Sequence, residues 1–135
     1  MKSKFGIFII FAILTWNISL SAKCLGGNCE NGYGTAEFPR GDIYTGEWKD
    51  GMASGRGVLK YKNGNEYTGE WKNGKANGRG VLIFQDGTRY VGEWKDSVAH
   101  GNGTMYDDKG KMLFTAVWNN GKVVEESPFN QIDSR

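Results

Sequence analysis

The sequence has a single histidine and two cysteines among its 135 residues, so the side chains that most often bind metals or catalyse reactions are scarce. A structural zinc site takes four ligands, and Cys24, Cys29 and the distant His100 do not provide them. No nucleophile is accompanied by a base and an acid in a recognisable spacing. We therefore expect no metal, no cofactor and no catalytic residue, and we predict that the protein is not an enzyme.

The sequence also lacks a hydrophobic run long enough to span a bilayer, which takes about 20 apolar residues. The apolar run at residues 5–16 is shorter, follows Lys2 and Lys4, and precedes a polar segment that ends in small residues. This order is typical of a secretory signal peptide. We predict a signal peptide over residues 1–22, cleaved after Ala22, and a periplasmic or secreted protein. A retained membrane anchor is the alternative.

An excess of charge is absent from the chain that remains after cleavage. Removal of Lys2 and Lys4 lowers the 17 basic residues to 15, which equals the 15 acidic residues. Without a basic patch to neutralise phosphates, nucleic acid is not expected as a partner. Adhesion to an anionic membrane through bulk charge is also weakened.

Both cysteines lie in a short segment, residues 23–30, directly after the predicted cleavage site. Two neighbouring cysteines in an exported chain usually form a disulfide. We predict that Cys24 and Cys29 are bonded and attach this segment to the domain that follows. The alternative is a lipid anchor on Cys24, although Lys23 stands where lipid-attachment signals carry a small residue.

The sequence is rich in glycine, with 21 residues, and it repeats itself. The octapeptides YTGEWKDG, YTGEWKNG and YVGEWKDS begin at Tyr44, Tyr67 and Tyr90, a constant step of 23 residues. A half unit precedes them and a degenerate unit follows. A fixed period of this length indicates a repeat architecture. We predict a repeat domain over residues 31–126 and a C-terminal tail or cap over residues 127–135.

Each unit predicts two short strands. Alternation over residues 44–48 places Tyr44, Gly46 and Trp48 on one face, and residues 57–61 alternate in the same way. The Asn-Gly and Asp-Gly pairs at residues 63–64 and 86–87 favour tight turns. The fold class is therefore all-β, a single open-ended antiparallel sheet of stacked hairpins.

The glycines explain the aromatic residues. A glycine in the middle of an aromatic face leaves room for a ring from the neighbouring strand, so we expect ladders of stacked rings. One unit cannot bury its face alone, and stability then comes from neighbouring units. On the other face, Glu47, Glu70 and Glu93 are expected to form cross-strand pairs with basic residues such as Arg56 and Arg79. His100 is interpreted as part of a loop.

The pattern Y-x-G-x-W-x-x-G-x-x-x-G-x-G at this step resembles the MORN repeat (membrane occupation and recognition nexus), from residue 31 to about residue 125. The resemblance implies an elongated, curved sheet that binds other molecules without catalysing a reaction. Members of the family are associated with protein contacts, self-association and acidic phospholipids. Ser97, Asp107 and Ala116 depart from the pattern, so the last unit is interpreted as a cap.

We predict a protein-interaction or scaffolding module that binds a protein partner, or a second copy of itself, through the aromatic face. A lipid-binding or glycan-binding module is the alternative, because tyrosine and tryptophan suit sugar faces and membrane interfaces. Stacking alone also accounts for the rings. The predicted site residues are Tyr44, Trp48, Tyr61, Tyr67, Trp71, Phe84, Tyr90 and Trp94.

Overall fold

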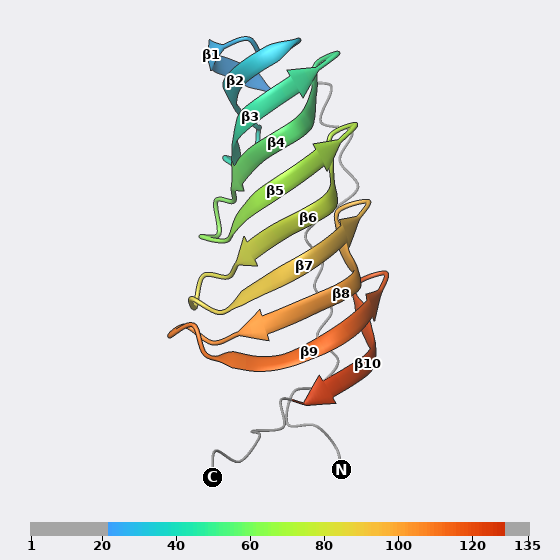
Figure 1. The fold of residues 1–135 in the computed structure, drawn as a ribbon. Coiled ribbons are helices and arrows are strands. Elements are labelled where there is room, and N and C mark those ends of the chain that lie inside the picture. The colour runs from blue at the N-terminus through green and yellow to red at the C-terminus, as the bar shows by residue number, and fades with distance from the viewer. Residues whose placement is uncertain (1–21, 129–135) are drawn as a thin grey trace.

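The computed structural model describes residues 22–128, which form one ten-stranded antiparallel sheet whose strand order is the order of the chain. The strands stack along one axis from β1 to β10 (Figure 1). Their bounds are β1 Lys23–Gly27, β2 Gly32–Glu37, β3 Ile43–Lys49, β4 Met52–Lys60, β5 Glu66–Lys72, β6 Lys75–Ile83, β7 Arg89–Lys95, β8 Val98–Tyr106, β9 Met112–Asn119 and β10 Lys122–Pro128.

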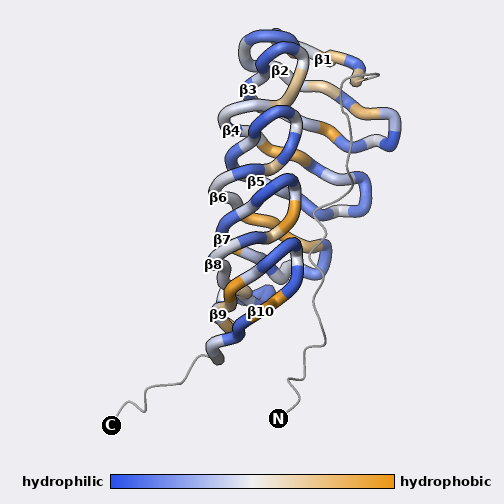
Figure 2. The backbone as a smooth tube through the Cα atoms, turned by 90° about the vertical axis from the view of Figure 1, so that its right-hand side faces the viewer, coloured by the Kyte–Doolittle hydropathy of each residue, from blue (hydrophilic) through white to orange (hydrophobic). Residues whose placement is uncertain are grey.

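This architecture confirms the predicted fold class, an open antiparallel sheet of hairpin repeats. Only strands and turns occur in residues 22–128. No helix in that part of the chain has the length and apolar character needed to cross a bilayer. The hairpins curl rather than lie flat, and hydrophilic turns border more hydrophobic strand centres (Figure 2). The repeat therefore builds an elongated, curled stack.

Tight turns do occur at Asn63-Gly64 and Asp86-Gly87, where the Gly64 N–H donates to the Tyr61 carbonyl at 3.0 Å and the Gly87 N–H to the Phe84 carbonyl at 2.9 Å, but the two-residue hairpin turns lie elsewhere. Two-residue turns join β3 to β4 at Asp50-Gly51 and β5 to β6 at Asn73-Gly74, with both residues of each turn at positive φ. These are the backbone angles of a type I′ hairpin turn. The Asn63-Gly64 pair lies instead in the five-residue connection between β4 and β5. The two kinds of connection alternate along the stack (Figure 1).

The strands that follow the two-residue turns are also longer than expected. His100, interpreted as part of a loop, belongs to β8, and Ser54 at the same position of the first complete unit belongs to β4. The strand continues because a bulge absorbs the extra residues, with the register shifting between Gly46 and Glu47. Gly55 takes up the bulge with φ +57°, an angle that favours glycine.

The core is the face that carries the aromatic residues. Tyr44, Tyr67 and Tyr90 are each 1% exposed or less, and the three tryptophans of the complete units are also buried. A Cβ added to Gly57 would clash with the ring of Tyr44, which lies over that glycine from the neighbouring strand. The prediction that glycines make room for rings is confirmed.

The rings form one continuous column rather than two separate ladders. Tyr44 contacts Trp48 at a centroid distance of 5.1 Å and Trp71 at 5.2 Å, both edge to face. The same pair of contacts recurs in the next units, so tyrosine and tryptophan alternate along the column as far as Trp118. Edge-to-face pairs contribute about 0.5–1.5 kcal/mol each beyond the area they bury. Successive repeats are thereby connected through their cores.

The structure describes part of the chain at each end of the predicted repeat domain. Cys24 on β1 and Cys29 in the following loop are bonded, which confirms the predicted disulfide. Ser127 and Pro128, the first two residues of the predicted tail, belong to β10. The predicted signal peptide and the rest of the predicted tail lie outside the described residues, so those divisions of the chain stay predictions.

We predict that Gly80→Ala destabilises the protein strongly because its Cβ would overlap the Tyr67 ring. Overpacking of this kind costs about 1–3 kcal/mol. Gly26→Ala is the matched control, since a Cβ there meets no atom within 4 Å. Urea denaturation of both variants measures the free energy of unfolding. Equal losses in the two variants would contradict the role given to the glycine.

Candidate functional site

The eight aromatic residues predicted as a binding site lie inside the molecule. Seven are buried and Phe84 is partly buried against the same core cluster. Six of the rings contact one another edge to face, so the faces of those six are not open to a ligand in this structure, whereas Tyr61 borders a small pocket beside Arg40 and Asp42. The geometry gives these residues a structural role, and direct contact with a partner stays a prediction. They are Tyr44, Trp48, Tyr61, Tyr67, Trp71, Phe84, Tyr90 and Trp94.

The polar atoms of the column are used to hold the backbone. The Tyr67 hydroxyl donates to the Glu70 carbonyl at 3.1 Å, across the bulge of its own strand. The Trp71 indole N–H donates to the Gly57 carbonyl at 3.1 Å, and Trp94 repeats this bond one unit later at 3.2 Å. A buried donor that has its partner stabilises the fold instead of destabilising it. The column is thus both an apolar core and a set of backbone anchors.

Burial also changes the acidity of four tyrosines. Removal from water raises the pKa of Tyr67 well above its ordinary value, and the nearby Tyr61 phenol and Glu70 carboxylate add to the effect. Burial likewise raises the pKa of Tyr44, Tyr61 and Tyr90. The hydroxyls of Tyr44, Tyr67 and Tyr90 therefore stay protonated at neutral pH, and each donates to a backbone carbonyl.

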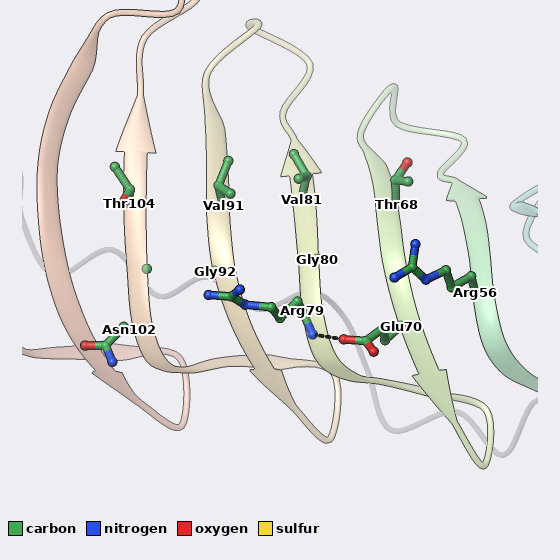
Figure 3. Close-up of a pocket in the computed structure, with 11 residues that line it drawn as sticks. Arg56, Thr68, Glu70, Arg79, Gly80, Val81, Val91, Gly92, Asn102 and Thr104 are labelled. Carbon is green, nitrogen blue, oxygen red and sulfur yellow. Dashed lines mark hydrogen bonds between the residues drawn. The ribbon is translucent and has the colours of Figure 1, made fainter.

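The opposite face of the sheet is hollowed. Side chains of β4–β8 line an open pocket of about 630 Å³, which we call the trough (Figure 3). A row of β-branched residues crosses it, in which Thr68 pairs with Val81, Val81 with Val91, and Val91 with Thr104. A second pocket of about 280 Å³ shares Asn102 and Thr104 with the trough and extends it to β10.

Charged residues form a second row beside the β-branched row (Figure 3). Arg56 stands opposite Glu70 in the strand register, and Arg79 opposite Glu93. The expected cross-strand pairing is therefore confirmed in the register, but within residues 22–128 no ion pair of 4.0 Å or less joins these arginines to these glutamates. In the close-up, the Arg56 and Arg79 side chains extend across the neighbouring strands instead.

The glutamates have a structural task that the sequence analysis missed. The Glu93 carboxylate accepts the backbone N–H of Asn102 at 2.7 Å, on the bulged strand beside it. Glu47 and Glu70 accept the backbone N–H groups of Arg56 and Arg79 in the same way. The carboxylates satisfy donors that the bulge leaves unpaired. The exposed guanidinium groups of Arg56 and Arg79 line the trough together with the Glu70 carboxylate.

The described residues contain no cluster of three or more histidine, cysteine, aspartate or glutamate side chains that could hold a metal ion. His100, the single histidine, lies on β8, and its Nδ1 atom is buried and unpaired. No nucleophile with a base and an acid is brought together within residues 22–128.

The profile of the MORN repeat family matches residues 44–66, 67–89 and 90–112, three consecutive units in the phase of the column. Together the matched units span half of the chain. No curated protein sequence gave a significant match. MORN repeats are commonly interaction or membrane-binding modules, and proteins built from them are typically non-enzymatic.

We predict that alkali unfolds the protein from about pH 10 upward. The pKa of each buried tyrosine is raised on folding, so the stabilisation is complete below the ordinary tyrosine pKa of about 10 and is lost above it. Each buried tyrosine then contributes a slope of about 1.4 kcal/mol per pH unit. Urea denaturation between pH 8 and 11.5 measures this, and Tyr67→Phe should reduce the slope. An unchanged slope in that variant would contradict the assignment.

Proposed function

The chain belongs to the MORN-repeat family, and from this premise we propose that it is a non-enzymatic module that binds a protein partner along the trough. The observation that carries the proposal is the difference between the two faces. The aromatic face is buried because its rings pack on one another, while the trough face is open to solvent over β4–β10. The proposed contact surface is therefore the face opposite to the predicted aromatic site.

The chemistry of the trough suits an extended polypeptide. Its floor carries the half-exposed methyl and hydroxyl groups of Thr68, Val81, Val91 and Thr104, which offer both apolar contact and hydrogen bonds. Arg56 and Arg79 supply two cations beside that row. Neighbouring strands lie about 4.8 Å apart, so side chains of a segment crossing the strands meet a new pair of groups at a regular interval. Mixed contacts of this kind are typical of protein interfaces.

A membrane-lipid or glycan role is the second candidate, and one observation favours the lipid form. Lys49, Lys72 and Lys95 are exposed and each ends its strand beside a two-residue turn, so the three lie along one edge of the stack. Rows of lysine attract anionic lipid surfaces. Asp50 and Asp96, exposed in the same turns, weaken the positive charge of this edge.

We also propose that the protein acts outside the cytoplasm, in the periplasm or as a secreted protein. The order of charged, apolar and small residues over residues 1–22 supports this location. The disulfide between Cys24 and Cys29 supports it as well, because disulfides persist in oxidising compartments.

Two matched triple variants test the proposal. Arg56→Ala/Arg79→Ala/Val91→Lys changes the trough, and Lys49→Ala/Lys72→Ala/Lys95→Ala changes the lysine edge. Each would be compared with the wild type for proteins captured from an envelope extract and for sedimentation with phosphatidylglycerol vesicles. We expect the trough variant to lose a captured protein that the edge variant retains.

The opposite pattern would contradict the proposal. If the edge variant alone loses binding, and vesicles sediment the wild type at low salt but not at high salt, the lipid candidate replaces it. Capture of no protein by the wild type would also count against a protein partner. Circular dichroism of both variants checks that the sheet is intact.

A further inference from the structure

The first strand, β1, carries a disulfide-bonded cysteine at the register position where later units carry a tyrosine. Cys24 on β1 pairs with Ala36 on β2. In the complete units the corresponding pair is Tyr44 with Leu59, and Leu59 lies one period of 23 residues after Ala36. The register therefore places Cys24 where the later units have a tyrosine.

The glycine of this unit is also covered in a different way. Gly34 lies one period before Gly57, whose face is covered by the Tyr44 ring. A Cβ added to Gly34 would instead lie 3.0 Å from the Sγ atom of Cys29 and 3.0 Å from the Asn28 backbone. Cys29 is also partly buried against the core cluster. A sulfur atom and a loop backbone thus occupy the space that a phenol ring fills elsewhere.

The loop that carries Cys29 has its own bonds to β2. The Asn28 N–H donates to the Tyr33 carbonyl at 2.9 Å, and the Cys29 Sγ atom lies 3.4 Å from the Thr35 carbonyl. Beyond the loop, Trp48 donates to the Gly34 carbonyl at 3.0 Å, as Trp71 does to Gly57. The covered glycine is therefore part of the first anchor of the aromatic column.

We propose that the Cys24–Cys29 disulfide is an oxidation-dependent end cap of the aromatic column, which takes the place of the tyrosine that this unit lacks. Cys24 occupies the register position of the missing tyrosine on β1, and its disulfide bond holds Cys29 over Gly34. All five residues of β1 are exposed, so apart from its backbone pairing with β2 this strand has no buried side chain that keeps it on the sheet. A repeat stack needs a terminal unit that differs from the internal ones, and the open edge of a sheet otherwise pairs with other chains.

The cap is reversible through ordinary thiol chemistry. A dithiol attacks the sulfur of the exposed Cys24 as a thiolate, forms a mixed disulfide and then closes its own ring. The S–S bond of the protein breaks, Cys24 and Cys29 each gain a proton as thiols, and the dithiol is oxidised by two electrons. Reduction then releases Cys29 from Gly34 and frees β1.

Hydrogen exchange measured by mass spectrometry on the full chain, oxidised and after dithiol treatment, tests the cap. We expect reduction to speed exchange of the β1 and β2 amides at least tenfold and to leave β7–β9 unchanged. The double variant Cys24→Ser/Cys29→Ser should exchange like the reduced protein and should not respond to dithiol.

A rescue variant separates the cap from a simple cross-link. In Cys24→Tyr/Cys29→Ala the new ring has the register to lie over Gly34, so β2 should regain slow exchange and become insensitive to dithiol. Equal exchange of β2 in the oxidised and reduced wild type would overturn the proposal. Faster exchange across β1–β10 after reduction would overturn it as well, because a cap acts at one end. Neither result depends on the folding of a variant.

Discussion

The structure depends on the contact between a tyrosine ring and a glycine of the neighbouring strand. Tyr67 can lie over Gly80 only because that residue has no Cβ, and its ring then meets Trp71 and Trp94 edge to face. The hydroxyl of the same residue donates a hydrogen bond to the Glu70 carbonyl, at the bulge of the strand. One side chain therefore fixes the core, the link to the next unit and the bend of the strand. This is why the octapeptide recurs with so little change.

That contact also decides which face is left for function. Rings that pack on glycines and on one another have little free surface, and the indole N–H groups of Trp48, Trp71 and Trp94 donate to backbone carbonyls. The side chains of the opposite face remain in contact with solvent. They are mainly β-branched and charged residues, and they line the open trough. A sheet that buries one face of every strand thus presents the other as a repeating surface, and it is this surface that we propose as the binding site.

Much of the fold could be predicted from the sequence, because alternation along a strand has a period of two and glycine has a known effect on packing. The disulfide between Cys24 and Cys29 could also be predicted, because two neighbouring cysteines in an exported chain usually form a bond. The length of β4 was not, since glycines at 55 and 57 look like a loop unless the bulge at Gly55 is known. The role of Glu47 was missed because a carboxylate that accepts a backbone N–H leaves no spacing pattern.

The site was harder to predict than the fold for a similar reason. Alternation shows that Tyr44 and Trp48 share a face with each other, and it shows equally that Thr68 and Arg79 lie on the other. It does not show whether a face is covered. The curl of the sheet and the interlocking of rings from successive units decide that, and both depend on contacts between repeats.

The most direct test of this account is hydrogen exchange of the tryptophan indole groups, followed by nuclear magnetic resonance after transfer to heavy water. The account predicts that the indole N–H signals of Trp48, Trp71 and Trp94 persist, since each is buried and donates to a glycine carbonyl one unit earlier in the stack. Loss of all three signals within the dead time would show that the rings are open to solvent. The aromatic face, and not the trough, would then be the surface to examine for a partner.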